Sequence, residues 1–161
     1  MVLRTSLLCV ILVGMASAYP FCMYGSLRKG MYYHDKYMSS CTSGGVTKTA
    51  ESDYTLMDAG AFPHAIKHGS WRGGGKSQIV CEYFDCPDSA VGPLDRLEQC
   101  CSGRWYTKKL VPLANGKKGW IYLLPHRKQV KWLHNSPIVT SGDWKKKTYS
   151  SGKCKKDKCH A

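Results

Sequence analysis

Cysteine is the residue type that most constrains the chemistry of this 161-residue chain, which contains nine of them. Cys9 lies in an apolar run, residues 7–15, that follows Arg4 and precedes the small residues 16–18. This order is typical of a secretory signal peptide, so we expect cleavage before Tyr19 and a secreted, extracellular product. A membrane anchor or a buried helix is the alternative, but the run is shorter than the ~20 apolar residues that span a bilayer.

The eight cysteines that remain after cleavage form an even set, which indicates a disulfide framework in an oxidising compartment. Their spacing leaves the pairing open, with one exception. The neighbours Cys100 and Cys101 have Cα atoms ~3.8 Å apart, less than an unstrained disulfide prefers, so we expect each to have a different partner. Zinc binding is the weaker alternative, because thiols of secreted proteins are usually oxidised. The predicted disulfide cysteines are Cys22, Cys41, Cys81, Cys86, Cys100, Cys101, Cys154 and Cys159.

Other residue types that could do chemistry form no complete site in the sequence. His64 and His68 stand four residues apart and could share one face of a helical turn, but Ala65 replaces the glutamate of a zinc protease. We interpret both histidines as solvated loop residues. The sequence has no Gly-x-Ser-x-Gly elbow and no spare cysteine, although paired carboxylates can still meet in space. We therefore predict a protein that is not an enzyme, with no catalytic residue, metal or cofactor.

The positive charge of the chain is concentrated in its last 60 residues. Residues 19–101 hold eight Lys and Arg against nine Asp and Glu, whereas residues 102–161 hold fifteen against two. Aromatic faces beside cations suit acidic polymers, although the tryptophans could equally form the core of a small sheet. The predicted polyanion-binding residues are Lys108, Lys109, Lys117, Lys118, Arg127, Lys128, Lys131, Lys145, Lys146, Lys147, Lys155, Lys156, Lys158, Trp105, Trp120, Trp132 and Trp144.

Short extended segments must position these residues. Residues 104–111 and 119–124 predict a hairpin that turns at Asn115-Gly116, the dipeptide that most favours a tight turn. Further strands are expected at residues 30–33, 78–84 and 129–133, and a helical turn at residues 61–68. The predicted fold class is therefore small, disulfide-rich and mainly β, with short antiparallel strands, long loops and little helix after the signal peptide.

The cysteine spacing of residues 20–101 resembles the von Willebrand factor type C module. The most specific elements are Cys81 and Cys86-Pro87, with four residues between the two cysteines, and the later doublet Cys100-Cys101. Cys22, Gly25, Gly30, Tyr33 and Cys41 match the opening of the module. The family's Cys-x-Cys after Cys41 is missing, and similar spacing in an unrelated secreted scaffold is the alternative. The resemblance implies a non-catalytic extracellular binding or matrix module.

Three domains and three functions follow from these observations. The domains are a signal peptide at residues 1–18, a cysteine-rich module at 19–101 and a basic aromatic segment at 102–161 that ends in a lysine-rich, disulfide-tied tail. The first function is a matrix or adhesion protein that binds acidic polysaccharide or acidic matrix protein. The alternatives are a regulator that sequesters a growth factor and a cationic toxin or antimicrobial protein. Nucleic acid is not an expected partner, and no membrane span is expected.

Overall fold

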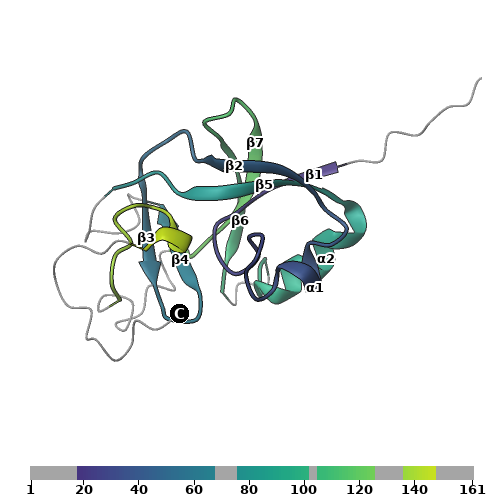
Figure 1. Ribbon diagram of the computed structural model, residues 1–161, viewed down its shortest axis with the longest axis horizontal. Helices are drawn as coiled ribbons and strands as arrows, with labels where there is room; N and C mark the ends of the chain where they lie inside the picture. The colour runs from purple at the N-terminus through teal and green to yellow at the C-terminus, as the bar shows by residue number, and fades with distance from the viewer. Residues whose placement is uncertain (1–17, 68–75, 102–104, 126–135, 148–161) are drawn as a thin grey trace, which may run out of the picture.

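A five-stranded mixed sheet organises the fold in this computed structural model, which describes residues 18–67, 76–101, 105–125 and 136–147. The strand order is β2-β5-β1-β7-β6 (Figure 1). β1 pairs antiparallel with β5 and parallel with β7, so segments on both sides of Cys101 share one sheet. The strands are β1 (Ala18–Met23), β2 (Thr42–Lys48), β5 (Val80–Pro87), β6 (Thr107–Pro112) and β7 (Lys118–Leu123).

Two hydrophobic clusters form because successive side chains of a strand point to opposite faces. In β7, Ile121 belongs to one cluster and Tyr122 to the other. The helices α1 and α2 contribute to the Tyr122 cluster, and the short η2 helix contributes Trp144 to the Ile121 cluster. Figure 1 shows α1 and α2 together at one end, with the β3–β4 hairpin at the other. These elements are β3 (Tyr54–Asp58), β4 (Pro63–Lys67), α1 (His34–Tyr37), α2 (Asp88–Leu97) and η2 (Trp144–Lys146).

Two of the predicted β elements are confirmed. β6 and β7 form the expected hairpin, with register from Thr107↔Leu123 to Pro112↔Lys118. Gly116 has φ +80°, the left-handed conformation that glycine adopts without a Cβ clash. β5 contains residues 80–84 of the strand expected at residues 78–84. The strand expected at residues 129–133 lies outside the described residues.

The predicted fold class is wrong, because the sheet contains a parallel pair and a ten-residue helix follows β5. Gly92 and Pro93 disfavour α2 in isolation, yet its Ala90 and Leu94 are buried, and that packing outweighs the local preference. Two local predictions also fail. Residues 63–67 form β4, not a helical turn, because they pair along their whole length with β3. Residues 31–33 are turn residues that lead into α1, not a strand.

The six described cysteines of the predicted disulfide set are bonded in the structure, and two of the three bonds hold β5. Cys22 of β1 is joined to Cys81, and Cys41, just before β2, is joined to Cys86. Cys100 is joined to Cys101, so the expectation that these neighbours pair elsewhere is wrong. The backbone turns sharply here, with φ +68° at Cys101. Cys154 and Cys159 lie outside the described residues.

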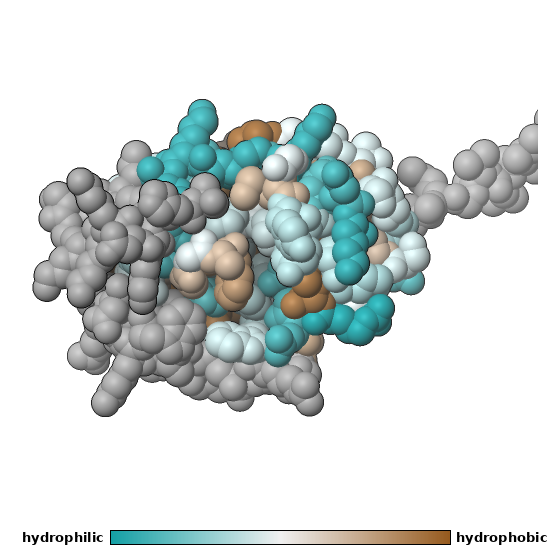
Figure 2. Space-filling view, turned by 60° about the horizontal axis from the view of Figure 1, so that its bottom comes forward, coloured by the Kyte–Doolittle hydropathy of each residue, from teal (hydrophilic) through white to brown (hydrophobic). Residues whose placement is uncertain are grey.

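The surface of the described residues is mixed in polarity. In the face shown in Figure 2, hydrophobic side chains form small separate patches between hydrophilic ones. The large apolar residues that are exposed are Tyr32, Val46, Phe62 and Leu110. Among the helices described, none has both the length and the apolar character needed to span a membrane.

Candidate active site

A pocket of about 220 Å³ opens where the loop after β1 meets the end of α2. The start of β4, the segment leading into β6 and Tyr122 of β7 complete its walls, so residues from five separate parts of the chain line it. The lining is mainly aromatic and apolar, and includes Tyr33, Phe62 and Trp105. Glu98 is the charged residue of the described lining. A concave, largely apolar pocket with few polar groups is typical of a small-molecule site.

Glu98 reaches the pocket because it continues the buried face of α2. Ala90, Leu94 and Glu98 follow one another at intervals of four residues, the spacing that places side chains on one helix face. The helix stops here, with Glu98 as its C-cap and Gln99 at φ +46°. Among the described residues no cation forms an ion pair with Glu98, and burial raises the pKa of its carboxyl from 4.5 to about 7. Such a group is half ionised at neutral pH and can both accept and donate a proton.

The loop after β1 supplies hydrogen-bond donors to the opposite wall. Gly25, Ser26 and Leu27 line the pocket. Their backbone N–H groups donate to no acceptor in the described part of the chain. Their carbonyls are all occupied: Gly25 O accepts from Arg28 N, Ser26 O from Tyr33 N, and Leu27 O from His34 Nδ1. Adjacent free N–H groups form a concave site that favours anionic oxygens.

Gly25 is required in that loop for a steric reason. A Cβ at this position would lie 2.9 Å from Cδ of Pro63, closer than side-chain carbons can approach. The start of β4 therefore packs directly on the backbone of this loop, residues 24–29, which we call the donor loop. This contact holds two walls of the pocket together.

Tyrosine hydroxyls stabilise the pocket walls. Tyr24 donates to the carbonyl of Tyr122 at 2.8 Å and accepts from the N–H of Ala65 at 3.3 Å. The Tyr106 hydroxyl and His64 Nδ1 share a hydrogen bond of 2.6 Å. Burial raises the pKa of Tyr24 and of Tyr106, so both hydroxyls stay protonated.

His64 is buried in β4 and not in a solvated loop, so that interpretation is wrong for this residue. Its ring stacks on Trp105 with a centroid distance of 6.1 Å and an interplanar angle of 8°. Burial lowers the pKa of His64 from 6.5 to about 4, which keeps the ring neutral at physiological pH. His68 lies outside the described residues.

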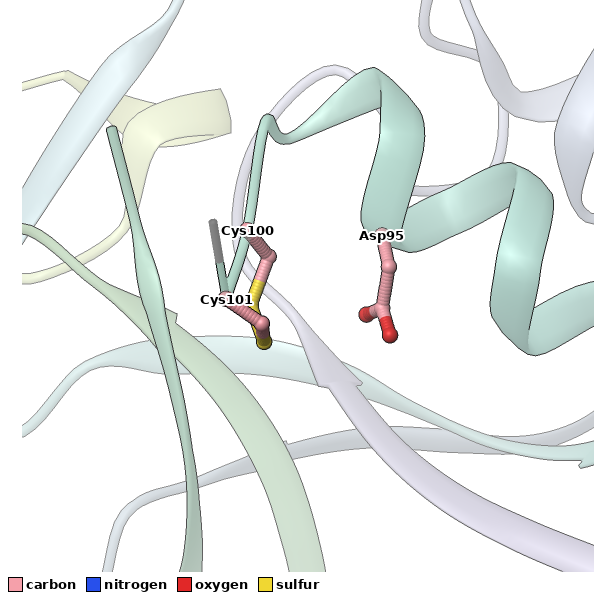
Figure 3. Close-up of side chains that lie close together, drawn as sticks. All are labelled: Asp95, Cys100 and Cys101. Atoms are coloured by element: carbon pink, nitrogen blue, oxygen red, sulfur yellow. A yellow bond between two sulfur atoms is a disulfide. The ribbon is translucent and has the colours of Figure 1, made fainter. Parts of the chain in front are cut away.

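A group of potential metal ligands beside the pocket has the wrong chemistry for a metal site. Figure 3 shows the carboxylate of Asp95 of α2 beside the sulfurs of Cys100 and Cys101, within 4.8 Å. These sulfurs are bonded to each other, whereas metal ions bind the free thiolate. The carboxylate of Asp95 is also engaged, because it accepts from Lys108 Nζ at 2.8 and 2.9 Å and from the Tyr122 hydroxyl at 2.7 Å.

The described residues of the predicted polyanion-binding set do not gather at one place. Lys108, Lys145 and Lys147 form ion pairs with acidic residues of the protein, whereas Lys109, Lys117, Lys118 and Lys146 are exposed. Trp144 is buried, Trp120 is half-buried, and Trp105 lines the pocket. The members that lie outside the described residues are Arg127, Lys128, Lys131, Trp132, Lys155, Lys156 and Lys158.

Glu98 and the donor loop were not predicted from the sequence. One sign of Glu98 was present: a lone acid at the four-residue spacing of Ala90 and Leu94, hence on an apolar helix face. The spacing did not lead to a predicted helix, because Gly92 and Pro93 both disfavour helix formation. The sign of the donor loop in the sequence is Gly25-Ser26, two residues after the end of β1 at Met23. Cys22 and Gly25 also match the opening of the von Willebrand factor type C pattern, which favoured that interpretation.

Known proteins resemble this chain over most of its length. Residues 21–146 match the family model described as "Gamma-glutamyl cyclotransferase, AIG2-like". The Methanocaldococcus jannaschii protein named "Putative gamma-glutamylcyclotransferase" is 28% identical over 129 residues, covering 76% of this chain and 92% of the relative.

Solved structures share the fold at lower identity. A mouse AIG2-like protein is 16% identical with a TM-score of 0.58, covering 77% of this chain and 87% of its own. A uropathogenic E. coli-specific protein is also 16% identical with a TM-score of 0.60, covering 80% and 94%. Part of Kluyveromyces lactis allophanate hydrolase matches with 17% identity and a TM-score of 0.60, covering 80% of this chain and 20% of the hydrolase. At these identities the likeness is one of fold.

These findings overturn the functional predictions from sequence. The match over residues 21–146 runs through the cysteine-rich and the basic segments alike, so the assignment to a von Willebrand factor type C module is wrong. The relatives are named for an enzymatic activity, and the predictions of a non-catalytic matrix, regulator or toxin protein are therefore also wrong. Export of the chain stays a prediction, since residues 1–17 lie outside the described part.

The family model and the similar solved structures thus point to the same fold, and the pocket with Glu98 lies within the matched residues. The family model covers the donor loop, α2, and the strands that form the walls of the pocket. The chain belongs to the gamma-glutamyl cyclotransferase, AIG2-like family.

Proposed function

We propose that this protein is an enzyme that cyclises γ-glutamyl groups, with Glu98 as its general base and acid. The single observation that carries the proposal is a carboxyl with a pKa of about 7 in a pocket whose opposite wall presents free N–H groups. The family match and the name of the archaeal relative support the same activity.

The chemistry of such a cyclisation fits this pocket. The α-amine of the γ-glutamyl group attacks its own γ-carbonyl carbon, and a C–N bond closes a five-membered lactam, 5-oxoproline. The bond between that same carbonyl carbon and the nitrogen of the leaving amine breaks. One proton must leave the attacking nitrogen and one must reach the departing nitrogen. Glu98 can accept the first proton as carboxylate and donate it to the leaving amine as acid.

The donor loop suits the remaining polar group of the substrate. A γ-glutamyl group carries an α-carboxylate, and in the described lining of the pocket no cation is present to pair with it. The N–H groups of Gly25, Ser26 and Leu27 can bind its oxygens in the way that backbone nests bind anions. The aromatic side chains at Tyr33, Phe62 and Trp105 are then left to contact the leaving amine.

The test is an assay for 5-oxoproline by chromatography and mass spectrometry, with γ-glutamyl amides that carry either an amino acid or a simple amine as leaving group. We expect turnover by the wild-type protein and a loss of about 10³-fold in kcat for Glu98→Gln, the range typical of a lost general base. The exposed Glu51→Gln is the matched control and should keep wild-type kinetics. Because Glu98 must be ionised to begin the reaction, kcat/KM should rise as pH increases through about 7.

Two results would contradict the proposal. One is the absence of 5-oxoproline from every γ-glutamyl amide with folded wild-type protein. The other is Glu98→Gln with kinetics equal to those of the Glu51→Gln control.

A further inference from the structure

Behind the donor loop lies a group of four charged residues, the charged cluster, made up of Arg28, Glu82, Asp143 and Lys145. Arg28 is 3% exposed and Glu82 is 5% exposed, so the centre of the cluster is buried. None of its members lines the pocket. Buried charges are costly unless they are paired, and this group balances two cations with two carboxylates.

Glu82 pairs with both cations of the cluster. Its Oε1 lies 3.5 Å from Nε of Arg28 and 3.8 Å from Nζ of Lys145. The second carboxylate of the cluster, on Asp143, pairs with Nη1 of Arg28 at 2.6 Å. Asp143 also accepts from the N–H of Lys145 at 3.0 Å, which fixes the start of η2.

The cluster holds both backbone polar groups of Lys29, the residue that ends the donor loop. Oε2 of Glu82 accepts from the N–H of Lys29 at 2.6 Å. Nζ of Lys145 donates to the carbonyl of Lys29 at 2.7 Å. The end of the loop is therefore tied to β5 and to the segment containing η2 at the same time.

The other end of the loop is tied to the same place on β5. Met23, the last residue of β1, stands opposite Glu82 in the antiparallel register. The backbone of Glu82 thus pairs with the residue just before the loop, and its side chain accepts a hydrogen bond from Lys29 at the end of the loop. Between these two points lie Gly25, Ser26 and Leu27, which line the pocket and whose N–H groups have no acceptor among the described residues.

We propose that Glu82 is a positioning residue of the pocket, which sets the donor loop so that its N–H groups can bind the α-carboxylate of a γ-glutamyl substrate. This inference rests on the proposed function. Glu82 acts through Lys29 and Arg28 and does not touch the substrate. Because the α-carboxylate is bound alike before and during cyclisation, loosening the loop raises KM and leaves kcat nearly unchanged.

Glu82→Gln is the first test. The amide keeps an oxygen for the N–H of Lys29 but loses the charge that holds Arg28 and Lys145, and Arg28 retains Asp143, so the variant should fold. We expect KM for a γ-glutamyl amide to rise about tenfold, with kcat within about threefold of wild type. A tenfold change corresponds to the binding free energy of roughly one hydrogen bond. The rise of kcat/KM through pH 7 should persist, because Glu98 is intact.

Lys145→Met is the second test. Lys145 lies at the edge of the cluster, and the substitution removes only its hydrogen bond to the carbonyl of Lys29 and its weaker ion pair with Glu82. We expect a smaller rise in KM, about threefold, and its reversal in Lys145→Arg. A readout that does not depend on activity is amide hydrogen exchange at Arg28 and Tyr33, whose N–H groups donate to the loop carbonyls of Gly25 and Ser26. Exchange at these two amides should be faster in Glu82→Gln than in Glu51→Gln.

The outcomes separate this inference from the proposed function. If wild type forms 5-oxoproline but Glu82→Gln keeps both its KM and its loop exchange rates, Glu82 is not a positioning residue and the cyclotransferase assignment stands. Equal losses of kcat and kcat/KM in Glu82→Gln would also overturn the inference. If wild type forms no 5-oxoproline, the proposed function fails, and unchanged exchange at the loop would independently refute the anchoring role.

Discussion

Glu82 is buried and Glu98 is half-buried, and the two carboxyls stand in opposite electrostatic surroundings. Glu82 is surrounded by cations and backbone donors: Arg28, Lys145 and the N–H of Lys29. Glu98 has no cation partner among the described residues and lies in an aromatic pocket, where burial raises its pKa to about 7.

The difference teaches how one residue type takes two roles in one fold. A buried carboxylate with partners stays charged and holds other groups in place. A buried carboxyl without partners exchanges its proton near neutral pH, which is what acid–base catalysis needs. Substitutions that remove a partner or a charge therefore probe this contrast directly, and their effects on stability should differ in sign.

The largest effect is expected from Arg28→Met, which leaves the buried carboxylates of Glu82 and Asp143 without their shared cation. We expect a loss of about 3–5 kcal/mol in the free energy of unfolding, measured by urea denaturation at pH 7. The methionine keeps much of the packing volume, so the loss reports charge. A loss below about 1 kcal/mol would mean that the cluster is not effectively buried.

Glu98→Gln should act in the opposite direction on stability. The folded pKa of Glu98, about 7, lies above the unfolded value of 4.5, so its contribution is fully present below pH 4.5 and is lost as pH rises through 7. At pH 8 the variant should therefore be more stable than wild type by on the order of 2 kcal/mol, and about equal at pH 4.5.

The measurement is urea denaturation of wild type and Glu98→Gln across pH 4.5 to 8. Taking the difference between the two proteins removes the contribution of His64, whose lowered pKa makes both less stable as pH falls toward 4. A constant difference across this pH range would contradict the raised pKa of Glu98.

Tyr106→Phe tests the uncharged wall of the pocket. The substitution removes the hydroxyl that is bonded to His64 Nδ1 at 2.6 Å and keeps the ring in place. We expect a loss of about 1–2 kcal/mol in the free energy of unfolding, because a buried polar atom loses this partner. Thermal unfolding against wild type measures it, and an unchanged midpoint would show that the bond contributes nothing.

Glu51→Gln should have the smallest effect. Glu51 pairs with Lys67 at 3.1 Å, but both side chains are at least 40% exposed. Exposed pairs are screened by water and salt, so the loss should be below about 1 kcal/mol and should vanish at high salt. Urea denaturation at low and high ionic strength measures both quantities. A loss as large as that of Arg28→Met would remove the distinction between buried and exposed charges.

The part of the fold that could be predicted is the part set by neighbouring residues. Asn115-Gly116 predicts the β6–β7 turn because its backbone preference is local. The β-rich run at residues 78–84 predicts β5 for the same reason. α2 could not be recognised in this way, because Gly92 and Pro93 oppose a helix and only the burial of Ala90 and Leu94 outweighs them.

The cysteines show the same limit. Their number indicated disulfides, and Cys22, Cys41, Cys81 and Cys86 do bond across the sheet. The disulfide pairing depended on β5 lying between β1 and β2 in the sheet, and cysteine spacing does not indicate that strand order. The spacing instead suggested an unrelated module, because short cysteine intervals recur in many folds.

The sequence by itself determined the residue types available to this protein: a lone acid at the four-residue spacing of two apolar residues, a glycine shortly after a strand, and an even set of cysteines. Tertiary structure decided what they do. α2 brings Glu98 to the loop at Gly25 from more than seventy positions away in the chain, and the sheet places Glu82 beneath that loop. The pKa of a carboxyl depends on the groups and the solvent around it, and those surroundings exist only once the chain has folded.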